Sequence, residues 1–212
     1  MFSYLRYKIN KIAKRQTITD SLDKFFLKNK KIAIVSNNCW NIGVYKNLNL
    51  KFNTPFIGLA IYPKDFIKLI SNLEYYLKNP LQAEHFLHET EYVDNRGNSY
   101  PVAILHGVTI HFIHYKNALE AVEKWNRRCS RLLDFIQNNS IDDVIFKCCD
   151  MDFKEQDNII KFNELRFRRK IYIQNRQNSI LLNRDGTFPD GIQLYKIRIL
   201  YYLKFLYLFK GL

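Results

Sequence analysis

The feature that most constrains the fold is the alternation of short, apolar, β-branched runs with longer segments of helical periodicity. Strand-like runs occupy residues 32–35, 144–149 and 170–174, and apolar residues recur at helical spacing over residues 63–76, 117–138 and 155–167. Strands joined by helices of this length usually pair in parallel, because the helix returns the chain to the start of the next strand. The sequence therefore predicts an α/β fold of three layers with a largely parallel sheet.

A different pattern interrupts this alternation between residues 85 and 114. Apolar and polar residues alternate there, a turn is expected at residues 94–98, and residues 108–114 are a further strand candidate. A period of two is typical of an antiparallel sheet with one solvated face. We therefore expect an antiparallel hairpin inserted into the parallel fold.

Two basic segments flank this central region. Residues 1–29 and 192–212 are both predicted to form amphipathic helices, rich in Lys, Arg and aromatic residues. The predicted organisation is an N-terminal helix (residues 1–29), an α/β domain (residues 30–191) and a C-terminal helix (residues 192–212) that packs on or beside the domain. With 212 residues, of which 47% are hydrophobic, one core accounts for the chain.

The net charge of +13 is concentrated at the two ends. Residues 1–31 contribute +7 and residues 161–212 contribute +8, which leaves −2 for the middle of the chain. This distribution favours docking of the ends onto an anionic membrane surface, and it disfavours nucleic acid as a partner of the folded centre. A general bias towards lysine in the coding sequence would give the same excess without any partner.

Cysteine content and hydropathy indicate a cytoplasmic location. Four cysteines are too few for a disulfide scaffold, and no metal-ligand spacing occurs, so no metal site is predicted. The N-terminus lacks the unbroken apolar core of a secretory signal. The apolar run near the C-terminus is interrupted by cations, so no window long enough to span a membrane is expected.

Candidate site residues were sought where strands end, because ligands bind at the carboxyl ends of the strands in open α/β sheets. Polar or reactive residues directly follow three of the predicted strands: Ser36, Asn37, Asn38, Cys39 and Trp40 after the first, His114 and Tyr115 after the hairpin, and Asp150 and Asp152 after residues 144–149.

Two kinds of chemistry are compatible with these residues. Ser36 or Cys39 could accept an acyl group, with His114 as the base and with amide groups of the loop stabilising the oxyanion. Alternatively, Ser36 only caps backbone groups and Cys39 is a small buried residue. Asp150 and Asp152 resemble the paired-acid metal motif of many sugar-nucleotide glycosyltransferases, because alternate residues of an extended segment point the same way.

The predicted helix over residues 117–138 carries a third candidate group. Spacing of three places Trp125, Arg128 and Arg131 on one face, with Arg127 beside them. Such a face can bind a phosphate, a pyrophosphate or a sugar acid, with arginine donating paired hydrogen bonds and tryptophan stacking on the ligand. The alternative is a solvated basic face with Trp125 in the core.

Taken in order, several of these segments resemble a bacterial family described as exopolysaccharide biosynthesis proteins. The likeness covers residues 30–175, and the segments that carry it are Ser36–Trp40, Asn53–Phe56 with Phe66 and Tyr76, Tyr100–Val102, His114 with Tyr115, and Lys124–Arg128. The family pattern has two glycines after the tryptophan, whereas this chain has Asn41, Ile42 and Gly43.

The resemblance implies a role in assembling capsule, lipopolysaccharide or a related glycan, and an α/β fold. It implies a peripheral location at the inner membrane, where a transferase would act on a lipid-linked glycan with an acyl-CoA or a sugar nucleotide as donor. No cofactor can be named. The alternative is a non-enzymatic module that docks on the membrane and recruits glycan-assembly enzymes, and a nucleic-acid-binding protein is less favoured.

Overall fold

The central sheet has the predicted parallel arrangement. The computed structural model describes residues 30–88, 92–94, 97–151, 156–175, 181–183, 185 and 187–201, and also residues 4, 5, 8, 9, 12, 20, 21, 24, 25 and 27. Three parallel strands lie in the order β1-β4-β5, formed by Ala33–Ser36, Val144–Cys149 and Arg169–Ile173. The predicted α/β class is confirmed, and each strand lies within one residue of its expected bounds.

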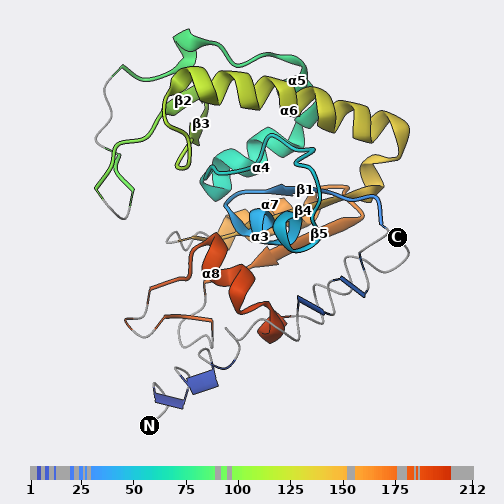
Figure 1. The fold of residues 1–212 in the computed structure, drawn as a ribbon, viewed down its shortest axis with the longest axis vertical. Helices are drawn as coiled ribbons and strands as arrows, with labels where there is room; N and C mark the ends of the chain where they lie inside the picture. Colours follow the sequence, from blue (N-terminus) through green and yellow to red (C-terminus); the bar gives the residue numbers. More distant parts are fainter. Residues whose placement is uncertain are drawn as a thin grey trace.

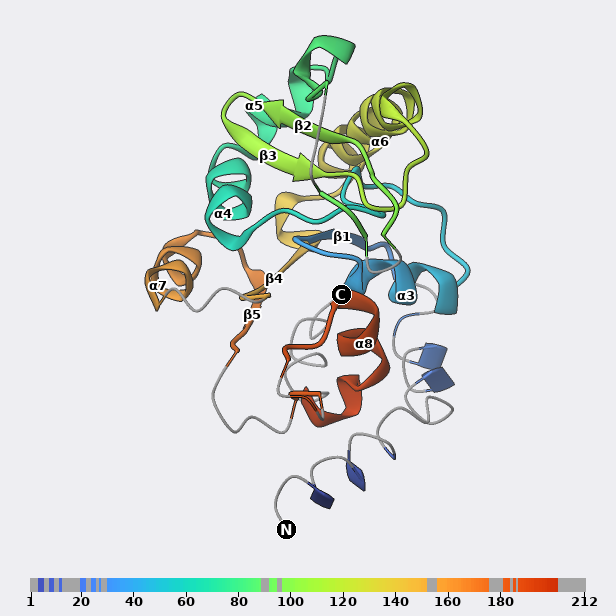
Figure 2. The same cartoon turned by 90° about the vertical axis from the view of Figure 1, so that its left-hand side faces the viewer.

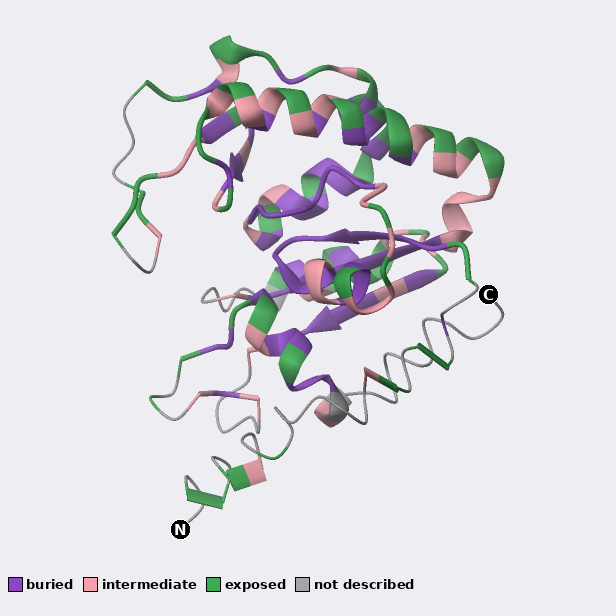
Figure 3. Ribbon diagram, viewed as in Figure 1, coloured by how far each residue is buried: buried purple, intermediate pink, exposed green. Residues whose placement is uncertain are grey.

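Helices cover both faces of this sheet (Figures 1 and 2). One side carries α4 (Pro63–Ser71), α5 (Leu73–Lys78), α6 (Ala118–Asn138) and α7 (Gln156–Glu164), and the other carries α3 (Trp40–Asn47) and α8 (Gly191–Lys196). Alternate strand residues feed the two cores: Val35 and Phe146 face the first group, and Ile34 and Ile145 face the second. The sheet is therefore the buried middle layer of three, as Figure 3 shows.

The helices begin where the local sequence favours them. Asn117 caps α6 by accepting a hydrogen bond from the Glu120 backbone N–H at 2.9 Å. Pro63 is the first residue of α4, where its missing N–H removes no helical hydrogen bond. The single helix predicted over residues 63–76 is instead divided at Asn72 into α4 and α5.

The antiparallel excursion is a separate sheet of two strands, β2 (Val102–Leu105) and β3 (Val108–His111). The turn that joins them consists of His106 and Gly107, with φ of 48° and 72°. Two consecutive left-handed residues match the type I′ turn of tight hairpins. At the turn expected at residues 94–98, the Gly97 N–H donates to the Asp94 carbonyl at 2.9 Å and Val93 forms an isolated antiparallel bridge with Ser99, while residues 95 and 96 lie outside the described residues.

The C-terminal part of the described chain packs onto the domain. Leu194 and Tyr195 of α8 are buried against α3, and the turn η3 (Arg198–Tyr201) follows. The fully buried guanidinium of Arg198 pairs with the Asp20 carboxylate, so the two basic segments meet there. Of the helix predicted over residues 192–212, residues 202–212 lie outside the described residues, as do most of residues 1–29.

Candidate functional site

The turn between β1 and α3 is buried and closely tied to the end of β4. The Asn37 side chain accepts a hydrogen bond from the Cys149 N–H at 3.1 Å and donates to the Cys149 carbonyl at 2.9 Å. It pairs with the β4 backbone as another strand residue would. Asn37 therefore holds the turn against the carboxyl edge of the sheet.

A group of polar side chains, which we name the Lys147 cluster, lies under this turn. Its members are Ser36, Asn38, Lys147 and Cys149, all of them buried. Lys147 Nζ donates to Asn38 Oδ1 at 2.8 Å and lies 3.1 Å from Cys149 Sγ. Asn38 Nδ2 also lies 3.1 Å from that sulfur, and Ser36 Oγ donates to Asn38 Oδ1 at 3.4 Å.

Lys147 is the most unusual member of this cluster. Its side chain is fully buried, yet the ion pairs between described residues do not include it. Buried lysines are rare and normally have a charged partner, because an ammonium loses its hydration on burial. Among the described residues, no carboxylate lies within ion-pair distance of this lysine at the end of β4.

Cys39, one of the two expected nucleophiles, is a buried thiol in this structure. Burial and, to a smaller extent, the nearby Asp190 carboxylate raise the pKa of Cys39 to about 12, although Lys147 opposes this rise. The thiol therefore stays protonated at neutral pH in this conformation, and its sulfur lies 3.7 Å from the Leu59 carbonyl.

His114 and Tyr115 lie on the far side of residues 57–59. The Tyr115 hydroxyl donates to the Ile57 carbonyl at 2.6 Å and accepts from Arg128 Nη1 at 2.8 Å. Burial raises the pKa of Tyr115 to about 12, and Arg128 opposes that rise. Gly58, with φ of 74°, allows the chain to pass close to both His114 and Tyr115.

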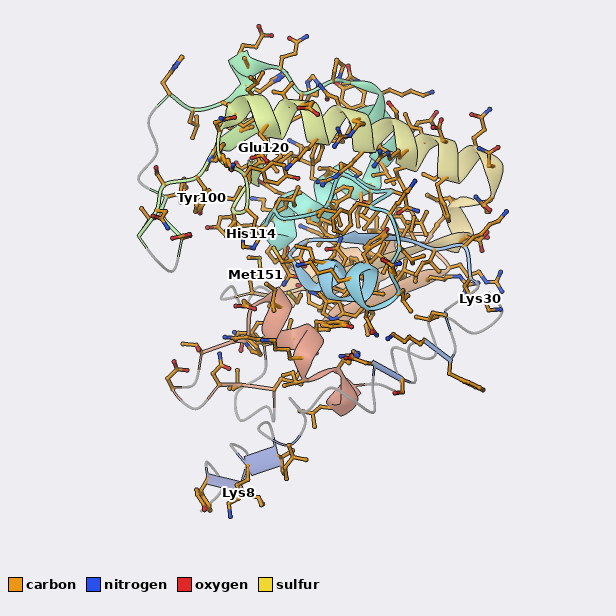
Figure 4. The ribbon with its side chains drawn as sticks, viewed as in Figure 1. Lys8, Lys30, Tyr100, His114, Glu120 and Met151 are labelled. Atoms are coloured by element: carbon orange, nitrogen blue, oxygen red, sulfur yellow. The ribbon has the colours of Figure 1, made fainter. Side chains whose placement is uncertain are left out.

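Residues 57–59 thus contact Cys39 of the first predicted set and both members of the second, His114 and Tyr115, but no catalytic pair forms. His114 is exposed, and no described hydrogen bond of the chain joins it to Ser36 or Cys39. Figure 4 shows His114 and Met151, the latter just after β4, on the same side of the molecule. The base expected for acyl transfer is near the carboxyl edge but not in place beside a nucleophile.

The residues expected to stack on a ligand pack in the interior instead. Trp40 contacts Tyr195 of α8 edge to face, with ring centroids 6.4 Å apart. Trp125 lies in the core against Phe56 at 5.7 Å. Arg127 is exposed and pairs with a carboxylate on its own helix.

Arg128 is the member of this helix face that is buried. Its guanidinium lies over the Phe52 ring at 5.3 Å, and its Nε has no hydrogen-bond partner among the described residues. The sequence left open whether this face binds a ligand or is a solvated basic face with Trp125 in the core. Trp125 is in the core. Arg128, however, is buried rather than solvated, and it is not paired with a described carboxylate.

Asp150 has a structural role at the end of β4. Its carboxylate accepts hydrogen bonds from the Tyr172 hydroxyl and, at 2.7 Å, from the Asn175 N–H. Asp152 lies outside the described residues. Among the residues that the structure describes, no three His, Cys, Asp or Glu side chains are grouped to hold a metal ion.

Helix α8 covers the turn above the Lys147 cluster. A Cβ atom placed on Gly191 would lie 2.5 Å from the Trp40 backbone nitrogen and 2.7 Å from that of Cys39. Only glycine permits this approach, because the neighbouring atoms are backbone and cannot move aside. A Cβ atom placed on Gly43 would lie 2.2 Å from a ring carbon of Tyr195, so glycine at this position allows the Tyr195 ring to pack against α3.

Comparison with known proteins gives a family for this arrangement. Residues 9–182 match the model of DUF1919, a domain of unknown function. The chain belongs to the DUF1919 family. An uncharacterized protein of Haemophilus influenzae is 31% identical over 150 residues, which are 71% of this chain and 65% of that relative. The chain thus spans less than two thirds of that relative's length.

The DUF1919 match includes all four residues of the Lys147 cluster and ends before α8 begins at Gly191. Two of the four, Lys147 and Cys149, were not among the residues predicted for the site. The signal for Lys147 was present in the sequence, since it is the one charged residue in a strand of six whose residues are all buried. A lysine inside an otherwise apolar strand is a candidate functional residue on physical grounds.

Proposed function

We propose that this DUF1919 chain is a transferase in the building of a cell-surface polysaccharide, and that it binds a donor carrying a pyrophosphate at the carboxyl edge of the sheet. The substrate would be a lipid-linked glycan, and the donor an acyl-CoA or a sugar nucleotide. The observation that carries the proposal is the buried ammonium of Lys147, which has no described carboxylate as a partner.

The two donor classes share the chemistry that this edge would recognise. Both carry a pyrophosphate, and an anion at the Lys147 cluster would supply the missing counter-charge. The position of the Lys147 cluster also suits binding of a pyrophosphate. The strands β1 and β4 both end at this cluster, and the first turn of α3 begins beside them. A donor can reach Lys147 only if α8 moves away from the turn, because Gly191 lies against Cys39 and Trp40.

The proposal leaves two reaction types to be separated. For acyl transfer, Ser36 or Cys39 would accept the acyl group, which requires the same movement to expose them and to bring His114 closer. For glycosyl transfer, Asp150 would have to give up its hydrogen bonds to Tyr172 and Asn175.

Calorimetric titration of the full chain with acetyl-CoA, UDP-glucose and inorganic pyrophosphate tests the proposal. We expect one donor class to bind, and Lys147→Met to weaken that binding by about 10- to 100-fold, the value of one or two hydrogen bonds to a charged group. Lys161→Met, at an exposed lysine of α7, is the matched control and should leave binding unchanged.

The outcomes separate the alternatives. Binding of acetyl-CoA alone selects acyl transfer, and binding of UDP-glucose alone selects glycosyl transfer. If neither donor binds, or if Lys147→Met binds as tightly as Lys161→Met, the proposed site is wrong.

A second candidate function, that of a membrane-docked module, is favoured by the side chains near the N-terminus. Tyr4, Leu5, Ile12 and Phe25 are all more than half exposed, Phe25 at 81%, and lysines lie between them. Exposed apolar side chains among cations suit the interface of an anionic bilayer. In the part of the chain that the structure describes, no helix has the length and hydropathy needed to cross a membrane.

Sedimentation with anionic vesicles tests this second candidate. Replacing Ile12 and Phe25 by serine should release the chain from vesicles of phosphatidylglycerol and phosphatidylcholine. Ile160→Ser is the control, because Ile160 is 57% exposed on α7, away from the basic ends. Equal sedimentation of all three proteins would exclude docking through this segment.

A further inference from the structure

Lys147 and Cys149 hold a nitrogen and a sulfur in contact. They are two residues apart on β4, so both side chains point to the α3 and α8 side of the sheet. The distance from Lys147 Nζ to Cys149 Sγ is 3.1 Å. The Asn38 side chain fixes both atoms, with its oxygen 2.8 Å from the nitrogen and its own nitrogen 3.1 Å from the sulfur.

The other three cysteines have different surroundings. Cys39 and Cys148 have backbone carbonyls as their described sulfur contacts, at 3.7 and 3.9 Å, and Cys129 is packed in the apolar core. Burial raises the pKa of all three thiols. Cys149 is the cysteine of the described chain whose sulfur contacts an amine.

We propose that Lys147 and Cys149 are an oxidative modification site, at which dioxygen joins Nζ and Sγ through a single bridging oxygen. One bridging atom spans a gap of this size with little movement, whereas a direct nitrogen–sulfur bond would require a much closer approach. The inference does not depend on the proposed function.

The reaction balances with dioxygen as the oxidant. The ammonium first releases a proton to give the neutral amine. Cys149 then loses its thiol hydrogen and Lys147 loses one amine hydrogen, while one oxygen atom forms the N–O–S bridge and the other leaves with these two hydrogens as water. Nitrogen and sulfur are oxidised, and both oxygen atoms are reduced. Dioxygen is small enough to reach this buried pair without a large movement of the chain.

The cross-link would change the carboxyl edge electrostatically. The bridged nitrogen no longer carries the ammonium charge, so the Lys147 cluster becomes neutral and loses its attraction for anions. A thiol reductant would restore the lysine and the cysteine, as it does for other reversible sulfur oxidation states. The pair would therefore switch the charge of this edge with redox conditions.

Mass spectrometry of the wild-type chain tests the proposal without relying on any variant. Protein equilibrated with air and denatured without reductant should contain a species that has gained one oxygen and lost two hydrogens. Excess dithiothreitol should remove this species. Trypsin should fail to cleave after Lys147 in the oxidised sample and should cleave there after reduction, because the bridged nitrogen lacks the charge that trypsin recognises.

Two variants and one control identify the atoms involved. Lys147→Arg and Cys149→Ser should each abolish the species. The control Cys148→Ser changes the neighbouring cysteine on the opposite face of β4 and should still form it. A wild-type chain with the same mass before and after reduction would overturn the proposal, and so would a species that adds oxygen without losing hydrogen or that persists in Lys147→Arg.

Discussion

The buried ammonium of Lys147 leads to a quantitative prediction: Lys147→Met raises the free energy of unfolding. Transfer of an ammonium from water to a protein interior costs several kcal/mol, even after the surroundings relax. Its best described partner is Asn38 Oδ1 at 2.8 Å, and a hydrogen bond to a charged group contributes about 1.5–3 kcal/mol. The second partner, the Cys149 sulfur, is a weak acceptor. The free-energy cost of burying the ammonium therefore exceeds the stabilisation that its hydrogen bonds provide.

Methionine removes this cost without leaving a new one. Its unbranched chain fills nearly the same space, so no large cavity forms. Asn38 Oδ1 keeps two donors, Trp40 N–H at 3.3 Å and Ser36 Oγ at 3.4 Å. We expect a gain of about 1–4 kcal/mol, the range for apolar replacement of buried charges. For a chain of this size, each kcal/mol raises Tm by about 2–4 °C.

Urea unfolding followed by tryptophan fluorescence measures this gain, because Trp40 and Trp125 are both buried. The control Lys161→Met, at an exposed position, should stay within about 0.5 kcal/mol of the wild type. A Lys147→Met chain that is less stable than wild type by more than about 1 kcal/mol would refute the reasoning. It would mean that the folded protein already compensates the ammonium in full.

Two further predictions concern the covering helix and the hairpin. Gly191→Ala places a methyl group against the backbone of Cys39 and Trp40 and should destabilise the fold by about 1–3 kcal/mol. The control Ile192→Ala, at a partly exposed neighbour, should destabilise it less. The midpoints of urea unfolding compare the two variants. Burial lowers the pKa of His111 in the folded chain, although Asp65 opposes this effect. At a pH between the folded and the unfolded pKa of His111, the proton therefore binds mainly to the unfolded chain. Stability should therefore fall as pH decreases below about 6.5 and level off below the folded pKa. His111→Gln should flatten this part of the curve, and an unchanged slope would contradict the assignment.

The sequence predicted the parallel sheet because its signals are local. Each strand contains a short run of apolar residues, and Asn117 and Pro63 mark helix starts by capping and by backbone geometry. The turn at His106 and Gly107 was not predicted, because His106 is not among the residues that usually mark a tight hairpin turn in a sequence, although it takes a left-handed conformation here. Lys68 Nζ stabilises that turn from α4 by donating to the Gly107 carbonyl at 2.9 Å, a contact between residues distant in sequence.

The structure places some of the polar residues that follow the predicted strands at the carboxyl edge of the sheet, and their role as a site stays a prediction. That polar residues collect where β1 and β4 end follows from parallel pairing, and Ser36 and Asn38 are indeed buried there. The role of Asp150 could not be predicted, since its partners Tyr172 and Asn175 come from the next strand and the residues after it. Lys147 lies within a strand rather than after one, so the rule that ligands bind beyond the carboxyl ends of the strands does not select it.

Helix α8 adds a constraint that the family match does not contain. The DUF1919 match ends at residue 182, yet residues 190–195 lie directly over the turn that holds the Lys147 cluster. The contact is made by two glycines, Gly43 beneath the Tyr195 ring and Gly191 against the backbone of residues 39 and 40. Neither glycine leaves room for a side chain, so α8 packs directly on the turn, and access to the buried Lys147 from this side requires α8 to move away from α3.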